Sequence, residues 1–116
     1  MNDRELLELA ARAAGYQFSY SYRSLSSPAV PVILAETGRW RQWDPRHDDG
    51  DALRLAVKLR LDITFYNGFQ EVAAEPSNGD GMNPSQEVFI EDPYAATRRA
   101  ITRAAAEIGK SMGGGE

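Results

Sequence analysis

Three arginines near the C-terminal end of the chain could bind a negatively charged ligand. Arg98, Arg99 and Arg103 lie within one predicted helix, where residues three or four apart share a face. Guanidinium groups donate paired hydrogen bonds to phosphate or carboxylate oxygens. Lys58, on another predicted helix, could add a further positive charge. These residues predict a surface that meets phosphate; the alternative is that each side chain is simply solvated.

Aromatic side chains could stack on a base that accompanies such a phosphate. Tyr20 and Tyr22 alternate with serines along a predicted strand, and Trp43 follows Trp40 by three residues in a segment rich in arginine. Aromatic rings stack on bases and attract cations, so Trp43, Tyr20 and Tyr22 are candidate ligand contacts. The same rings commonly close the edge of a hydrophobic core. The residue types alone leave both interpretations open.

A cluster of acidic residues around one histidine has the right chemistry for a metal site but the wrong spacing. A calcium loop of the EF-hand type that began at Asp44 would need an oxygen ligand at its third position and glycine at its sixth. The chain has Arg46 and Asp49 there. A single histidine among scattered acids also lacks zinc-site spacing. We therefore expect these side chains to cap a helix or to be solvated, and to bind no metal and no cofactor. The residues are Asp44, His47, Asp48, Asp49 and Asp51.

The composition argues against catalysis and against generic binding of duplex nucleic acid. The chain has no cysteine and one histidine, and no glycine-rich phosphate loop follows a predicted strand. These features predict a protein that is not an enzyme. Its net charge is -4, whereas duplex binding requires a positive surface. The N-terminus is charged and amphipathic, which predicts neither a signal peptide nor a membrane span, and the lack of cysteine suits a reducing cytosol.

Hydrophobic periodicity places these residues on alternating groups of helices and strands. Local signals support several of the boundaries. Asn2 is a predicted N-cap, Asn67-Gly68 predicts a hairpin, and Gly109 is a predicted C-cap. The predicted order is α-β-β-α-β-β-β-α, with helices over 2–14, 51–61 and 93–108 and strands over 16–22, 30–36, 62–67, 69–75 and 86–91.

This order predicts an α+β fold, because helices and strands must bury their apolar faces against each other. The expected architecture is a three-layer α-β-α sandwich-like domain over residues 1–110, with a mixed, mostly antiparallel sheet of about five strands. The helix after Asp49, the predicted N-cap, has so wide an apolar face that we expect it to be largely buried. We expect a flexible polar loop over 76–85 and a flexible tail over 111–116.

Three segments resemble a set of small phage and prophage proteins, the phage α-β-α sandwich domain family. They are WDPRHDDGDALRLAVKL over 43–59, AATRRAITRAAAEIG over 95–109 and the opening NDRELLELAARAAG over 2–15. They cover somewhat under half of the chain. The resemblance implies a sandwich fold, a phage or prophage origin and a bacterial host, and it brings no catalytic residues. Residues 16–39 and the loop over 76–85 fall outside it.

The resemblance and the residues together predict a small non-catalytic accessory protein. Its partner would be a host protein or a host signalling nucleotide, in a counter-defence type of role. An acidic nucleotide could meet the arginines and Lys58 through its phosphate, with tyrosine or Trp43 on its base. One alternative is a phage protein that binds single-stranded nucleic acid, which the acidic net charge disfavours. A second alternative is a homo-oligomeric structural component.

Overall fold

The computed structural model of the 116-residue chain describes residues 1–21, 29–77, 84–88 and 92–112. The first half contains α1 (Asp3–Ala14), β1 (Phe18–Ser21), β2 (Val30–Leu34) and β3 (Trp40–Gln42). The second half contains α2 (Asp49–Leu59), β4 (Leu61–Tyr66), β5 (Glu71–Pro76), β6 (Ser85–Val88) and α3 (Pro93–Met112).

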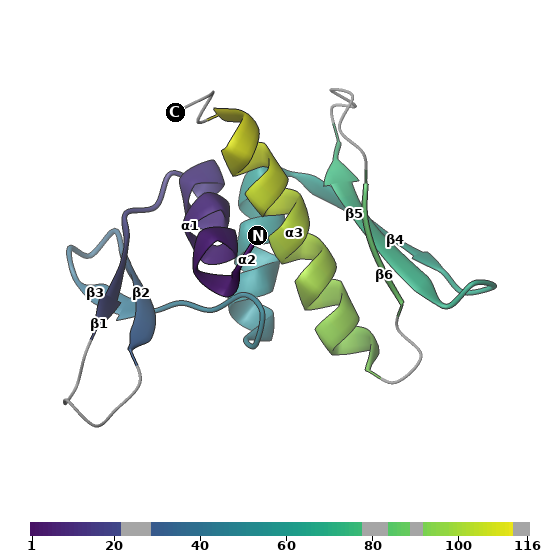
Figure 1. The fold of residues 1–116 in the computed structure, drawn as a ribbon, viewed down its shortest axis with the longest axis horizontal. Helices are drawn as coiled ribbons and strands as arrows, with labels where there is room; N and C mark the ends of the chain where they lie inside the picture. The colour runs from purple at the N-terminus through teal and green to yellow at the C-terminus, as the bar shows by residue number, and fades with distance from the viewer. Residues whose placement is uncertain (22–28, 78–83, 89–91, 113–116) are drawn as a thin grey trace.

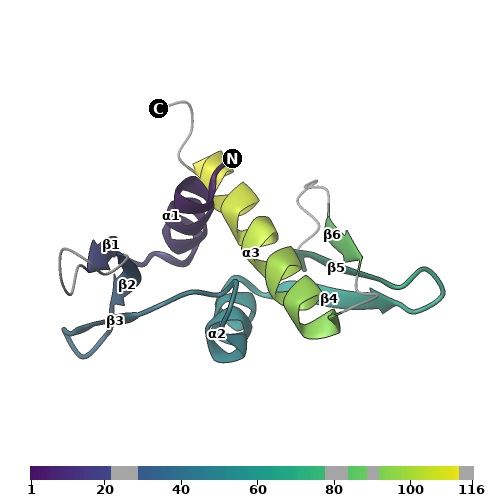
Figure 2. The ribbon, with the colours of Figure 1, turned by 60° about the horizontal axis from the view of Figure 1, so that its bottom comes forward.

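The helices form the central layer and a three-stranded sheet lies on each side of them (Figures 1 and 2). The sheet orders are β1-β2-β3 and β4-β5-β6, and every pairing within them is antiparallel. The predicted α+β class and its three helices are confirmed. The arrangement differs from the single sheet of about five strands in having two separate sheets and the additional short strand β3.

The division into two sheets follows from the connections between the strands. Neighbouring strands within each sheet are also neighbours in sequence, so each sheet forms by local antiparallel pairing. The 43–48 segment and α2 separate the two groups of strands. In sequence α2 follows the last strand of the first sheet and precedes the first strand of the second. It packs against α3 in the middle layer, so the chain passes through this layer from one sheet to the other (Figure 1). The hydrophobic periodicity predicts the strands but contains no information on which sheet each one joins.

Small side chains allow α1 and α3 to approach very closely. Ala10, Ala14 and Ala105 are buried between the elements of the core, and Gly109 is buried on α3. A Cβ atom added to Gly109 would lie 1.9 Å from the backbone oxygen of Leu9 on α1. The predicted C-cap at Gly109 is therefore wrong: α3 continues to Met112, and the glycine serves helix packing.

Side-chain caps begin the two shorter helices, and a left-handed glycine ends α1. The Asn2 side chain accepts a hydrogen bond from Glu5 N at 2.8 Å, as predicted, and Gly15 closes α1 with φ 76°. Asp48 caps α2 by accepting from Asp51 N at 2.8 Å. The predicted cap, Asp49, is instead the first residue of α2. Four aspartates lie within a few residues here, so the sequence does not specify which one caps.

Several predicted boundaries shift. The hairpin at Asn67-Gly68 is present, but Gln70, with φ 52°, lengthens its loop to residues 67–70. In the predicted 76–85 loop, Pro76 belongs to β5 and Ser85 to β6, and residues 78–83 lie outside the described residues. The predicted tail begins two residues inside α3, and residues 113–116 are also not described.

The helix α2 is less buried than its apolar composition suggests. Ala52, Leu55 and Ala56 face the core, whereas Leu53 and Val57 are 63% and 67% exposed. Leu53 and Val57 are four residues apart and therefore share one flank of the helix. The expectation of a helix covered on more than one side is wrong for this flank. Among the described residues, no helix has the length and apolar content needed to cross a membrane.

Candidate functional site: an arginine-lined groove

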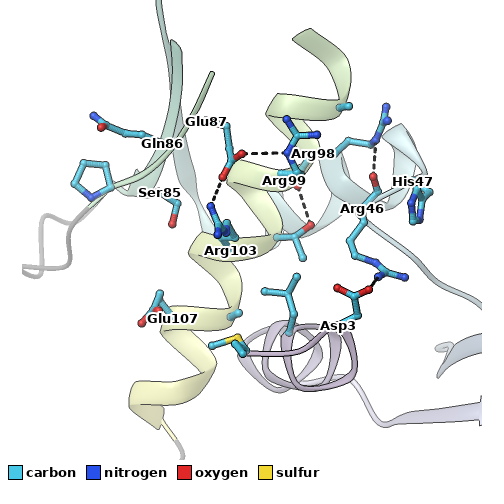
Figure 3. Close-up of a pocket in the computed structure, with 16 residues that line it drawn as sticks. Asp3, Arg46, His47, Ser85, Gln86, Glu87, Arg98, Arg99, Arg103 and Glu107 are labelled. Carbon is cyan, nitrogen blue, oxygen red and sulfur yellow. Dashed lines mark hydrogen bonds and ion pairs between the residues drawn. The ribbon is translucent and has the colours of Figure 1, made fainter. Parts of the chain in front are cut away.

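An open groove of about 910 Å³ runs along one side of α3. Its other walls come from the start of α1, from residues 46–47 and from β6 (Figure 3). The three arginines predicted as ligand contacts, Arg98, Arg99 and Arg103, all line it. A volume of this size is typical of small-ligand sites, which range over roughly 300–1,000 Å³. The fold therefore brings the three predicted arginines together in one groove.

Two of these arginines share one carboxylate, Glu87 on β6. Arg99 Nε donates to Glu87 Oε1 at 3.1 Å, and Arg103 Nη1 donates to Glu87 Oε2 (Figure 3). The register pairs Glu87 with Val72, which is completely buried, so both side chains lie on the face of the sheet that packs against α3. The carboxylate is 13% exposed, while Arg99 and Arg103 are 49% and 60% exposed. Both arginine side chains therefore remain accessible to solvent, and both line the groove.

Arg98 has a structural role despite its position in the groove wall. Its Nε donates to the backbone oxygen of Arg46 at 2.9 Å, and its Nη1 contacts Asp49 at 2.6 Å. The side chain is only 17% exposed. These contacts tie α3 to the segment that leads into α2. Arg98 thus differs from Arg99 and Arg103, whose side chains are about half exposed or more.

A second ion-pair network lies at the α1 end of the groove. Arg46 contacts Asp44 at 2.9 Å and Asp3 of α1 at 3.1 Å, and its side chain is 21% exposed. His47 Nδ1 lies 2.9 Å from Asp44 Oδ2. Burial by itself would raise the pKa of Asp44, but the hydrogen bonds from the Arg46 and His47 side chains outweigh burial and lower that pKa.

The lowered pKa of Asp44 predicts a loss of stability in acid. A carboxyl group with a depressed folded-state pKa stabilises the protein above its unfolded pKa, about 3.9, and this contribution is lost as the pH falls through the folded pKa. We expect Asp44→Asn to unfold at lower urea concentration than wild type at pH 7 and the difference to shrink below about pH 4. Glu36→Gln, which removes an exposed turn carboxylate, is the charge-matched control. A difference for Asp44→Asn that stays constant down to pH 2 would contradict this assignment.

Trp43 is a core residue. It is 1% exposed, and its ring makes edge-on contacts with Tyr16 at 5.8 Å and Phe18 at 6.0 Å between centroids. A ring buried to this extent has no face for a ligand, so the structure favours the core interpretation over stacking. Trp40, by contrast, is 50% exposed on β3.

The other predicted contacts lie away from the groove or outside the described residues. Tyr20 is partly buried on β1 beneath the guanidinium of Arg4, 5.0 Å from the ring centroid, and burial raises its pKa. Lys58 lies over the ring of Tyr16, with its Nζ 5.1 Å from the centroid. Neither residue lines the groove. Tyr22 lies outside the described residues.

The acidic cluster supplies the cap of α2, Asp48, but Asp51 is buried and not solvated as the sequence predicts. Asp51, 5% exposed, accepts hydrogen bonds from Arg41 at 3.1 Å, Arg54 at 2.8 Å and the backbone N–H of Asp44 at 3.0 Å. A smaller hollow of about 440 Å³ lies beside it. Within the described residues, no group of acidic or histidine side chains is arranged to hold a metal ion.

Sequence reasoning missed the acidic partners of the groove. Glu87 lies on a predicted strand, but the strand pattern alone does not indicate that it faces arginines 12 and 16 residues away. Asp3 is a first-turn residue of α1 whose pairing with Arg46 depends on helix packing. The alternation that places Glu87 on the face opposite Val88 was the one available signal.

In comparisons with known proteins, no family model, no curated protein and no solved structure matches this chain.

Proposed function

We propose that this protein is a non-catalytic binding protein whose groove holds a small phosphate-bearing ligand of the nucleotide type. The observation that supports this most directly is the Arg99–Glu87–Arg103 cluster. Two accessible guanidinium groups face one carboxylate at an open groove. Arginine donates to phosphate oxygens through a planar fork, which gives orientation as well as attraction.

The charge distribution supports a local anion site on an acidic protein. The chain carries a net charge of -4, so a polyanion such as duplex DNA would be repelled over most of the surface. A small ligand meets only the groove. In the groove Arg46 is paired with Asp44 and Asp3, and Arg98 is paired with Asp49. These carboxylates offset the charge of the two arginines. The accessible positive charge is concentrated at Arg99 and Arg103.

The biological setting of this proposal comes from the resemblance to phage α-β-α sandwich proteins. A phage or prophage accessory protein that captures a host signalling nucleotide would work by sequestration, and sequestration needs affinity rather than chemistry. A location in the host cytosol follows from the same setting.

A host protein is the second candidate partner, because several apolar side chains are exposed. Leu53 and Val57 on α2 are exposed, and Phe69 in the β4–β5 hairpin is 78% exposed. Exposed apolar and aromatic residues are common anchors in protein interfaces. Recovery of a host protein with the wild type but not with Leu53→Ser/Val57→Ser would favour this candidate.

Replacing both groove arginines should abolish ligand capture. We expect wild-type protein purified from bacterial cells to carry a few hundred daltons of extra mass in a native spectrum, and we expect this mass to be lost on denaturation. Arg99→Gln/Arg103→Gln should lack it, because glutamine can still contact Glu87 but carries no charge for phosphate. Arg12→Gln/Arg39→Gln, which removes two exposed arginines outside the groove, should retain it. Equal ligand mass in both double variants would contradict the groove as the site.

A further inference from the structure

Glu87 sets the net charge of the cluster at which a ligand would bind. Among the described residues, its two oxygens contact Arg99 and Arg103, one each. Two guanidinium charges and one carboxylate charge leave a single uncompensated positive charge. The nearby Arg46 does not add to it, because Arg46 is paired with Asp44 and Asp3.

Phosphate groups differ in the charge that they bring to such a cluster. A phosphodiester carries one negative charge, which would balance the cluster. A terminal phosphate carries about -1.5 to -2 at pH 7. Its additional charge would lie near the Glu87 carboxylate, whose repulsion acts more strongly on a dianion than on a monoanion and cancels part of the attraction of the two guanidinium groups.

Glu87 is held in place by its surroundings. It lies on β6, which pairs with β5, and its side chain is 13% exposed on the face against α3. Moving it out of the cluster would break both arginine contacts and require the carboxylate to find new partners. A ligand therefore meets the carboxylate as a fixed part of the site.

We propose that Glu87 is a specificity residue that shifts the selectivity of the groove from terminal phosphates towards phosphodiesters. The inference rests on the proposed function, because it requires that Arg99 and Arg103 contact the ligand. It adds the ligand class: a small molecule with a singly charged phosphodiester, such as a cyclic nucleotide. Glu87 selects by repulsion of the second charge, while the arginines supply the attraction.

Two adenine nucleotides test this directly, since they share base and sugar. Adenosine 3′,5′-cyclic monophosphate contains a phosphodiester, and adenosine 5′-monophosphate contains a terminal phosphate. Each would be titrated into the 116-residue chain while the side-chain Nε–Hε signals of Arg99 and Arg103 are followed by NMR. The affinity ratio should favour the cyclic nucleotide at least about fivefold more in wild type than in Glu87→Gln, the factor for one like-charge contact at about 4 Å in water. Glu87→Gln should gain more affinity for the terminal phosphate than for the cyclic form.

The control is Glu36→Gln, which removes an exposed carboxylate outside the groove. It should change both affinities by similar factors and preserve the preference of the wild type. Thermal unfolding of Glu87→Gln would establish that the variant is folded under the titration conditions.

The outcomes separate the two proposals. If both nucleotides shift the arginine signals but Glu87→Gln leaves their affinity ratio unchanged, the role of Glu87 is overturned and the binding function stands. If Glu87→Gln weakens both equally, Glu87 is a ligand acceptor or a positioning residue, and the proposal also fails. If neither nucleotide shifts the signals in either protein at millimolar concentration, the cluster is not a phosphate site and both proposals fall. Tighter, strongly salt-dependent binding of an oligothymidine would overturn the small-molecule class in favour of single strands.

Discussion

Gly109→Ala should lower the free energy of unfolding by about 3 kcal/mol and the melting temperature by about 10 °C. The added methyl group would lie 1.9 Å from Leu9 O and 2.7 Å from its carbonyl carbon. These are backbone atoms of α1, so the clash cannot be relieved by turning a side chain. The whole helix must move away from α3, and the alanines packed between them lose contact. Alanine favours a helix over glycine by about 1 kcal/mol, which is too little to offset this loss.

Gly68→Ala is the matched control for this substitution. Gly68 lies in the β4–β5 hairpin, and a Cβ atom there would meet nothing within 4 Å. We expect its free energy of unfolding, measured in urea, to stay within about 0.5 kcal/mol of wild type. Equal stability of the two variants would show that α1 and α3 are not packed as closely as the structure places them.

Trp43→Ala should cost about 3–5 kcal/mol, the range for removing a large aromatic residue from a packed core. Trp43 is 1% exposed and packs edge-on against Tyr16 and Phe18, so its loss would leave a cavity where the first sheet meets the helices. Urea denaturation would measure the loss. A ligand-stacking role would predict the opposite pattern, with lost binding and little change in stability.

Trp40→Ala provides the comparison, because Trp40 is 50% exposed on β3. Its removal should cost about 1 kcal/mol or less. The two residues also differ in fluorescence: a Trp40→Phe protein, with only Trp43 left, should resist quenching by acrylamide. Strong quenching of Trp43 would mean that the indole reaches solvent and that the core assignment is wrong.

Local signals in the sequence were sufficient for the features that depend on neighbouring residues. Asn2 and Gly15 mark the two ends of α1, as the capping side chain of asparagine and the left-handed conformation open to glycine predict. Asn67-Gly68 marks a hairpin. The spacing of Asp44, Arg46 and Asp49 excludes an EF-hand calcium loop. Arg99 and Arg103 lie on one helix face because they are four residues apart. Each conclusion rests on interactions within about one turn of helix or hairpin.

Local signals failed where several residues of one type could fill the same role. Asp48, not Asp49, caps α2, and the sequence offers both within one turn of the helix start. Leu53 and Val57 were expected in the core, since an apolar residue in a helix says nothing about whether a second element covers its flank. Trp40 and Trp43 are the same residue type three positions apart, yet one is half exposed and the other buried.

The sequence by itself thus determined the α+β class, the three helices, most of the strands and the concentration of arginines on α3. Only the tertiary structure decided that the strands form two sheets on either side of the helices, that Gly109 is a packing residue, and that Glu87 lies between Arg99 and Arg103. The physical reason is range. Caps, turns and helix faces are fixed by residues a few positions apart, whereas the groove depends on how α1, α3 and β6 pack, and no periodic pattern in the chain encodes that packing.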